Sequence, residues 1–164
     1  MSLTVRPARP ADAALVHGFI LALAAYEKLS DSVTATEADT ARALFAPAPR
    51  AFAEIAERDG TPIGFALWFY SYSTFAGRHG VWLEDLFVVP EARGQGGGKA
   101  LLRSLARRCV AEGLGRLEWT VLDWNAPSIA FYDALGAEAM DEWTTRRLHG
   151  EALRKLAGAK DPAG

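Results

Sequence analysis

The residues from Arg93 to Lys99 read Arg-Gly-Gln-Gly-Gly-Gly-Lys, and they separate an apolar, strand-like stretch from a helix-like one. A helix that starts here presents unpaired backbone N–H groups and the positive end of its dipole. Glycines at that end let a phosphate approach the N–H groups without hindrance from a Cβ atom. Two carboxylates, Glu84 and Asp85, lie within the strand-like stretch that comes before. The pattern predicts a site for a phosphate-bearing ligand about one strand length from two acids.

Two common phosphate loops do not fit the spacing. A nucleotide P-loop needs a glycine, four residues and then Gly-Lys-Ser/Thr, but Arg93 stands at the first glycine and Ala100 supplies no hydroxyl for Mg²⁺. The dinucleotide pattern G-x-G-x-x-G fits Gly94 and Gly96, but Lys99 occupies its third glycine position. The remaining pattern, Arg-x-x-Gly-x-Gly, resembles the pyrophosphate loop of the GNAT superfamily of N-acetyltransferases. An ordinary strand-to-helix turn is the simpler alternative.

Hydrophobic periodicity predicts the elements that would position these residues. Helices are predicted to end near Tyr26–Glu27, to run from a capping box at Thr36 to Phe45, to cover residues 98–112, to follow Asn125 as N-cap, and to cover residues 151–156. Strands are predicted over residues 3–6, 51–56, 63–72, 81–89 and 117–122 and around 143–148, with turns at Asp59–Gly60 and Gly77–Gly80. This order predicts an α/β (α+β) fold, with a mixed, mostly antiparallel sheet flanked by helices and one parallel βαβ crossover around the glycine loop.

Length and composition limit the classes of protein that fit. The 164 residues suit a single domain over residues 1–164, with a frayed tail at 158–164. The formal net charge of −2 argues against a nucleic-acid surface, and no stretch has the pattern of a leader or a membrane span. Three histidines are scattered without metal-ligand spacing, so no metal site is predicted. The single cysteine, Cys109, lies in an apolar helical run and fits a buried thiol in a reducing cytoplasm.

Four stretches make the chain resemble the diamine (spermidine/spermine) N-acetyltransferase family of the GNAT superfamily. The most specific reads Asn-x-Pro-Ser-Ile-x-Phe-Tyr, with Gly-Ala shortly after it. The resemblance runs from about Val5 to Ala157, and the four stretches are residues 23–27, 83–89, 93–98 and 124–137. It implies the acetyltransferase fold and an N-acetyltransferase that uses acetyl-CoA.

The resemblance implies that acetyl-CoA lies between the strands predicted at 81–89 and 117–122. Backbone groups of Leu86, Phe87 and Val88 would pair with the pantetheine arm and polarise the thioester carbonyl. Asn125 and Ser128 would contact the CoA arm while capping their own helix. The pyrophosphate would be held by the backbone amides of Arg93, Gly94, Gln95, Gly96, Gly97, Gly98 and Lys99.

The resemblance also assigns catalytic roles. Tyr132 matches the tyrosine that protonates the CoA thiolate as it leaves, and core packing of a buried tyrosine is the plainer alternative. Glu84 matches the carboxylate that helps, through water, to deprotonate the substrate ammonium. Because neighbouring residues of a regular strand face opposite ways, Glu84 and Asp85 are not expected to form a carboxylate pair. Direct transfer in a ternary complex is expected, since Cys109 lies outside the predicted crevice.

The acceptor side is expected to be acidic and aromatic. The match to the polyamine enzymes is weaker at Ser73, where they have an acidic residue after a tyrosine equivalent to Tyr72. A polycation would lose a charge-assisted contact there, so a small diamine or a lysine-like amino acid fits as well as a polyamine. The residues that match substrate-contacting positions are Tyr26, Glu27, Glu84, Asp85, Asp141, Glu142 and Trp143.

Two other functions share the cofactor site. A non-catalytic acyl-CoA-binding or sensor domain would keep the loop and lose the chemistry. An enzyme that acts on a protein or peptide amine would keep the loop and also the chemistry. The resemblance also implies a homodimer, and neither a nucleic-acid nor a membrane partner is expected.

Overall fold

The computed structural model describes residues 1–159, and residues 160–164 lie outside the described part. The chain divides into two compact units, which are called unit 1 (Met1–Leu122) and unit 2 (Asp123–Gly164). The single domain expected from the length stays a prediction. Most of the tail expected to fray, 158–164, lies outside the described residues.

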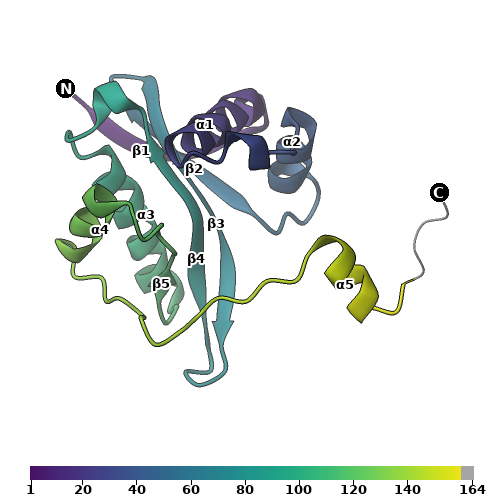
Figure 1. Ribbon diagram of the computed structural model, residues 1–164. Coiled ribbons are helices and arrows are strands. Elements are labelled where there is room, and N and C mark those ends of the chain that lie inside the picture. The colour runs from purple at the N-terminus through teal and green to yellow at the C-terminus, as the bar shows by residue number, and fades with distance from the viewer. Residues whose placement is uncertain (160–164) are drawn as a thin grey trace. The chain divides into compact units, whose positions relative to one another are not determined.

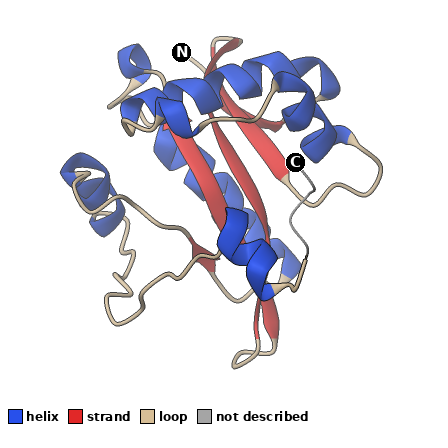
Figure 2. Ribbon diagram, turned by 45° about the vertical axis from the view of Figure 1, so that its right-hand side comes forward, coloured by secondary structure: helices blue, strands red, loops and turns tan. Residues whose placement is uncertain are grey.

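Unit 1 is a five-stranded sheet with helices on both faces. The strands follow the order β1-β2-β3-β4-β5, and every neighbouring pair is antiparallel except β4 and β5, which are parallel. Helices α1 and α2 lie on one face and α3 on the other (Figures 1 and 2). This arrangement confirms the predicted fold class. The elements are β1 (Leu3–Pro7), η1 (Pro10–Asp12), α1 (Ala13–Tyr26), η2 (Ser30–Ser32), α2 (Glu37–Phe45), β2 (Phe52–Arg58), β3 (Thr61–Ser73), β4 (Arg78–Val88), η3 (Pro90–Ala92), α3 (Gly97–Glu112) and β5 (Leu117–Glu118).

The main core lies between α1 and the sheet. Helix α1 repeats apolar residues at helical spacing, so Val16, Phe19 and Leu23 share one face and are buried with Phe65 and Phe87 of the sheet. The ring of Phe19 stacks on that of Phe65, with 5.6 Å between centroids. This packing fixes the end of α1 against β3 and β4, where the acceptor side is predicted.

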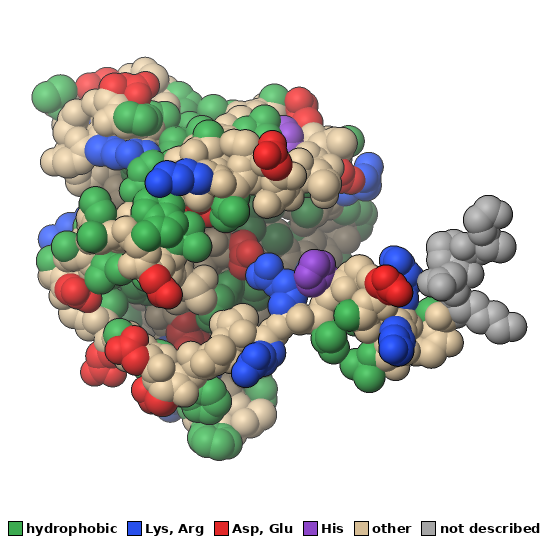
Figure 3. All heavy atoms as spheres, viewed as in Figure 1, with side chains coloured by type: hydrophobic (Ala, Val, Ile, Leu, Met, Phe, Trp, Pro, Cys, Tyr) green, Lys and Arg blue, Asp and Glu red, His purple; other side chains and the backbone are tan. Residues whose placement is uncertain are grey.

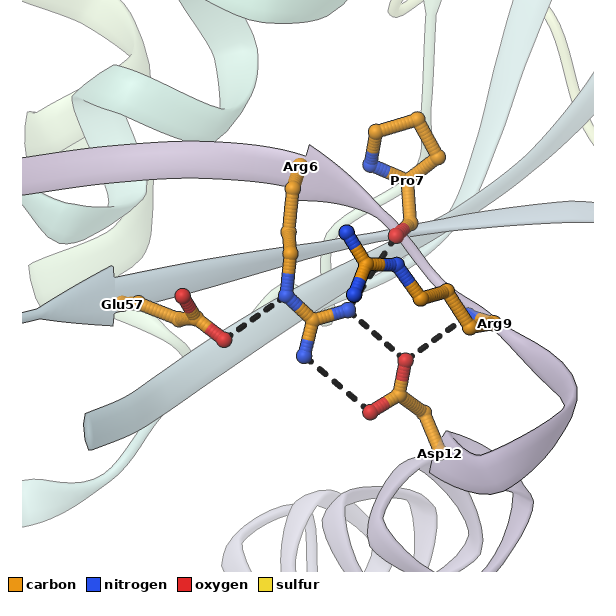
Figure 4. Close-up of polar contacts among 5 residues, drawn as sticks. All are labelled: Arg6, Pro7, Arg9, Asp12 and Glu57. Carbon is orange, nitrogen blue, oxygen red and sulfur yellow. Dashed lines mark hydrogen bonds and ion pairs between the residues drawn. The ribbon is translucent and has the colours of Figure 1, made fainter. Parts of the chain in front are cut away.

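Arg6 joins the first strand to the start of α1 (Figure 4). Its Nε donates to Glu57 Oε1 of β2 at 2.7 Å, and Nη1 and Nη2 donate to the carboxylate of Asp12 at 2.7 and 3.1 Å. The hydrogen bond from Arg6 lowers the pKa of Asp12, although burial opposes that shift, and the backbone N–H of Arg9 adds to the lowering. The ion pairs therefore hold η1 and the N-terminus of α1 on the edge of the sheet.

Strand β4 starts three residues earlier than predicted. Only Gly77 of the predicted turn Gly77–Gly80 has a positive φ, of +61°. Gly80 instead lies in the strand opposite Ser71. An ideal Cβ at Gly80 would lie 2.7 Å from the carbonyl oxygen of Arg116. The glycine is required because the chain leading into β5 passes so close, and the prediction mistook it for part of a turn.

Strand β5 is much shorter than the predicted span of 117–122. Leu117 pairs with Val81 and Glu118 with Trp82, and the pairing stops there. Strand β4 continues to Val88 with β3 as its strand partner. A bulge follows Trp82 closely, and bulged strands bend away from their neighbours. Among the described residues, the second edge of β4 is therefore open after Trp82.

Unit 2 contains α4 (Ala126–Asp133) and α5 (Gly150–Leu156). Helix α4 begins as predicted, because Asn125 Oδ1 accepts from the backbone N–H of Ser128 at 3.4 Å and a proline lies in the first turn. The strand predicted around 143–148 is not formed among the described residues of this unit. A strand needs a partner for its backbone groups, and no other strand lies within residues 123–159. No helix in residues 1–159 is long and apolar enough to span a membrane.

Candidate active site

The glycine stretch forms the N-terminus of α3, as predicted. Gly96 is the N-cap with φ of +88°, and Gly97 begins the helix. The backbone N–H of Ala100 makes the first helical hydrogen bond, to Gly96 at 2.9 Å. The N–H groups of Gly97, Gly98 and Lys99 precede that bond, so they are the donors that a helix N-terminus offers to an anion.

Hydrogen bonds connect the rest of the loop to β2 and to η3. Arg58 at the end of β2 donates from Nη2 to the carbonyl of Gln95 at 2.8 Å, and Gln95 Nε2 donates to the carbonyl of Glu91 at 3.1 Å. Gly94 has a φ of +70°, which favours glycine. Sequence reasoning missed Arg58, because its contact with Gln95 joins residues that are 37 positions apart along the chain.

Arg93 brings a predicted cofactor residue together with a predicted substrate residue. Its guanidinium lies 4.6 Å from the ring centroid of Tyr26 and 5.6 Å from that of Phe87. Its Nε donates to the carbonyl of Val88 at 2.9 Å. The guanidinium of Arg93 therefore contacts both the end of α1 and the end of β4.

The segment expected to pair with the pantetheine arm lies on the open edge of β4. On the other edge, Leu86 is paired with Ala66, and Phe87 with Phe65. Strand β3 comes unusually close here, since an ideal Cβ at Gly64 would lie 2.3 Å from the carbonyl oxygen of Phe87. The segment is thus fixed on one side and offers backbone groups on the other.

Strand β4 has a β-bulge at Glu84. Leu83 is paired with Trp68 of β3, and Asp85 is paired with Leu67, the residue next to Trp68. Glu84 is the extra residue between these two pairs. Bulges are frequent beside active sites, where they redirect side chains.

The bulge reverses the alternation of side chains along β4. Trp68 lies against Arg108 of α3, whose Cζ is 4.8 Å from its ring centroid, so its partner Leu83 shares the α3 face. Leu67 packs against the core cluster beneath α1, so its partner Asp85 shares the α1 face. A regular strand would have placed residues 83 and 85 on the same face.

Glu84 and Asp85 consequently lie on the same face, and the prediction that they face opposite ways is wrong. Glu84 Oε2 accepts a hydrogen bond from Trp82 Nε1 at 3.0 Å. Trp82 is paired with Phe69, which lies two residues from Leu67 and thus on the α1 face. Sequence reasoning missed Trp82, although its spacing of two residues from Glu84 in a strand was a usable signal.

The carboxylates of Glu84 and Glu27 repel the carboxylate of Asp85. Burial is the main cause that raises the pKa of Asp85 to about 6, and repulsion from Glu84 and from Glu27 raises it further. Burial also raises the pKa of Glu27, which follows α1 directly. An acid with a pKa near 6 is mostly ionised at neutral pH, so it can accept a proton, and the group as a whole attracts a cation.

The remaining acceptor and catalytic candidates belong to unit 2. Tyr132 lies on α4 with its ring 5.3 Å from that of Phe131. Asp141, Glu142 and Trp143 follow α4 in irregular chain, and the side chain of Trp143 is exposed. The cooperation of these residues with Glu84 stays a prediction.

Ser73 has a structural role at the position where the polyamine enzymes were expected to carry an acid. It ends β3, and its Oγ accepts from the backbone N–H of Ala76 at 3.2 Å in the turn before β4. The described residues contain no group of three or more histidine, cysteine, aspartate or glutamate side chains suited to a metal ion.

Comparison with known proteins shows the family to which the chain belongs. The sequence profile of the acetyltransferase (GNAT) family matches residues 20–137. Thialysine N-epsilon-acetyltransferase of Bos taurus is 38% identical over 165 residues, which cover 94% of this chain and 96% of that protein. L-ornithine N5-acetyltransferase of Arabidopsis thaliana is 30% identical over 197 residues, which cover 93% of this chain and 86% of that protein.

Solved structures share the fold. An integron cassette protein from V. cholerae superposes with a TM-score of 0.79 at 28% identity, over 97% of this chain and 99% of that one. Ribosomal-protein-alanine N-acetyltransferase of Brucella melitensis superposes with a TM-score of 0.74 at 18% identity, over 92% of this chain and all of that one. The chain therefore belongs to the GNAT family of acetyltransferases, in which acetyl-CoA is the acetyl donor.

Proposed function

We propose that the enzyme acetylates the primary amine of a small molecule, either a lysine- or ornithine-like amino acid or a short diamine. The observation that carries this proposal is the bulge in β4, which places Glu84 and Asp85 on one face of the sheet. The negative charge of Glu27 also acts on Asp85 and raises its pKa. Relatives similar over nearly the whole chain are named for acetylating thialysine and L-ornithine. Both names describe amino acids with a side-chain amine.

The acids would prepare the amine for attack. A primary amine has a pKa of roughly 10 and is protonated at neutral pH, so it must lose a proton before it can attack the thioester. Asp85, with its pKa of about 6, is ionised above that pH and can take part in the proton transfer. Glu84, oriented by Trp82, would attract the ammonium and relay the proton through water.

The cofactor residues keep the roles implied by the family. The backbone of Leu86, Phe87 and Val88 would hold the pantetheine arm and the thioester carbonyl along the open edge of β4. Residues 93–99 would hold the pyrophosphate at the N-terminus of α3, with Asn125 and Ser128 contacting the CoA arm. Tyr132 would protonate the departing thiolate.

Direct transfer in a ternary complex is favoured by the position of the only cysteine. Cys109 is buried on α3, and its Sγ lies 3.9 Å from the carbonyl oxygen of Arg116. Burial raises the pKa of its thiol. A buried thiol with a raised pKa is a poor nucleophile, so an acetyl-cysteine intermediate is not part of the proposal. The same reduced thiol supports a cytoplasmic location.

We also propose that the enzyme forms a homodimer. Unit 2 exposes several large apolar side chains: Met140, Trp143, Leu148, Leu153 and Leu156. Figure 3 shows apolar side chains gathered on α5 beside basic ones. Apolar side chains exposed together often mark a protein interface. Light scattering at micromolar concentration should give the mass of two chains, and a monomer would contradict this part of the proposal.

The function is tested with acetyl-CoA and a panel of amines, by measuring the free thiol released. The panel contains thialysine, L-lysine, L-ornithine, 1,4-diaminobutane, spermidine and a short peptide with a free N-terminus. Release with one of the amino acids or the short diamine supports the proposal. CoA binding without amine-dependent release would show a sensor domain, and release with the peptide alone would show a protein acetyltransferase.

A further inference from the structure

Arg58 is the last residue of β2, and its backbone is held on both sides. It is paired with Leu3 of β1 and with Thr61 of β3. The next residue, Asp59, donates from its backbone N–H to the carbonyl of Ser2 at 2.9 Å, and its Oδ1 accepts from the backbone N–H of Ser2 at 2.8 Å. The side chain of Arg58 therefore extends from a well-anchored part of the sheet.

The guanidinium of Arg58 binds the backbone of the glycine loop. Its Nη2 donates to the carbonyl of Gln95 at 2.8 Å. The side chain of Gln95 is also held, because its Nε2 donates to the carbonyl of Glu91 at 3.1 Å. Gln95 is thus fixed both at its carbonyl group and at its side chain.

The contact with Arg58 affects where α3 begins. In an α-helix the N–H of each residue donates to the carbonyl four positions earlier. Ala100 donates in this way to Gly96, and the helix begins at Gly97. The same rule would join the N–H of Lys99 to the carbonyl of Gln95, but within residues 1–159 that bond is not formed. The carbonyl is directed at Arg58 instead, so the N–H of Lys99 is left for an anion.

The same contact orients the N–H group of Gly96. A trans peptide is planar, so the C=O and the N–H of one peptide unit point in opposite directions, and no cis peptide occurs in residues 1–159. Because the carbonyl of Gln95 points toward the end of β2, the N–H of Gly96 points away from it. Gly96 has a φ of +88°, which favours glycine. Arg58 therefore acts on two N–H groups of the loop, those of Gly96 and Lys99.

We propose that Arg58 is a positioning residue for the cofactor, which rests on the role proposed above for residues 93–99. Its hydrogen bond to Gln95 holds the loop in the form that binds the pyrophosphate of acetyl-CoA. Without the guanidinium, the carbonyl of Gln95 can turn to the N–H of Lys99. This lengthens α3 by one residue and removes one donor from the anion site. The loss falls on binding of the pyrophosphate and not on the chemical step.

The test is calorimetry of the full-length protein with CoA and with dephospho-CoA, which keeps the pyrophosphate and lacks the 3′-phosphate. We expect Arg58→Ala to raise both dissociation constants by the same factor, of at least about 5-fold. Arg50→Ala is the matched control, because it removes the same charge from an exposed residue shortly before β2 begins at Phe52. It should leave both constants within about 2-fold.

Steady-state kinetics separate positioning of the loop from general damage to the structure. With an accepted amine, Arg58→Ala should raise KM for acetyl-CoA by at least about 5-fold and keep kcat within about 2-fold. Two results would overturn the role of Arg58 as a positioning residue. A loss with CoA that is absent with dephospho-CoA would show direct contact with the 3′-phosphate, and a fall in kcat equal to the rise in KM would show a general structural effect.

The binding measurement needs no amine, so it is independent of the acceptor. If the unaltered chain binds CoA no more tightly than pantetheine, which lacks the pyrophosphate, the role proposed for residues 93–99 is wrong and that of Arg58 with it. If the unaltered chain binds CoA more tightly than pantetheine and Arg58→Ala binds CoA equally well, only the role of Arg58 is wrong.

Discussion

The indole N–H of Trp82 donates a hydrogen bond to Glu84 Oε2 at 3.0 Å, and both side chains lie on the face of the sheet that carries Asp85. The two residues are separated only by Leu83, and the bulge that follows brings Asp85 to the same side. A carboxylate that is exposed on a strand is otherwise free to rotate. Trp82 therefore restricts the orientation of the Glu84 carboxylate on the face that also carries Asp85.

Replacing Trp82 with phenylalanine should lower kcat/KM for the amine. The variant keeps the ring but loses the donor, and a hydrogen bond at an exposed position is worth about 0.5–1.5 kcal/mol, which corresponds to roughly a 2- to 10-fold loss. The dissociation constant of CoA should not change. Steady-state kinetics and calorimetry measure the two quantities. In a Glu84→Gln background the same substitution should cost little more, and a full additional loss would show that Trp82 does not act through Glu84.

The pKa of Asp85 should appear in the pH profile of the enzyme. With its pKa raised to about 6, Asp85 is protonated below that pH and can neither attract an ammonium nor accept a proton from it. We expect kcat/KM for the amine to rise with pH through about 6 and Asp85→Asn to remove this rise. Persistence of the same rise in the variant would assign it to another group.

The same pKa shift predicts an effect on stability. A carboxyl whose pKa is raised on folding destabilises the folded state at pH values above that raised pKa, and the penalty disappears below the unfolded pKa of 3.8. Asp85→Asn should therefore raise the free energy of unfolding by about 1–3 kcal/mol at pH 8, after allowance for partial exposure. Urea unfolding at pH 8 and pH 4 tests this, because the gain should be small at pH 4.

The local parts of the site could be predicted from the sequence, whereas the parts set by strand pairing could not. The N-terminus of α3, predicted at Gly98 and found at Gly97, and the cap at Asn125 depend on residues a few positions apart, and both were located to within one residue. The bulge at Glu84 depends on how β4 pairs with Trp68 and Leu67, about sixteen positions earlier. No feature of the local alternation reveals an extra residue, so the relative direction of the two acids was predicted wrongly.

The length of β5 shows the same limit. The apolar stretch at 117–122 has the composition of a strand, but only Leu117 and Glu118 have partners on β4. Composition shows that these residues can form a strand. It does not show where the partner strand bends away and the pairing ends. Gly80 is a further example, because a glycine required by a close approach of Arg116 looks the same in the sequence as a turn glycine.

The contact between Arg93 and Tyr26 should link the cofactor site to the acceptor side. The Tyr26 ring lies under the guanidinium at 4.6 Å, and such a contact is worth about 0.5–1 kcal/mol at an exposed position. Tyr26→Leu should therefore raise the dissociation constant of CoA roughly 2- to 5-fold, while Tyr26→Phe, which keeps the ring, should not. Calorimetry with CoA in the absence of amine measures this. An equal effect of both substitutions would assign the loss to the hydroxyl and not to the cation.

Tyr132→Phe should lower turnover far more than it lowers affinity for the cofactor. The hydroxyl is the group proposed to give a proton to the CoA thiolate, and general acid catalysis is worth about 10²–10⁴-fold. The ring should keep its packing against Phe131, whose centroid is 5.3 Å away. We expect kcat to fall by about 10²-fold or more and the dissociation constant of CoA to stay within about 2-fold, as thiol release and calorimetry would measure. Tyr72→Phe, at an exposed tyrosine of β3, is the matched control and should keep kcat. An unchanged kcat in Tyr132→Phe would leave water or another side chain as the proton donor.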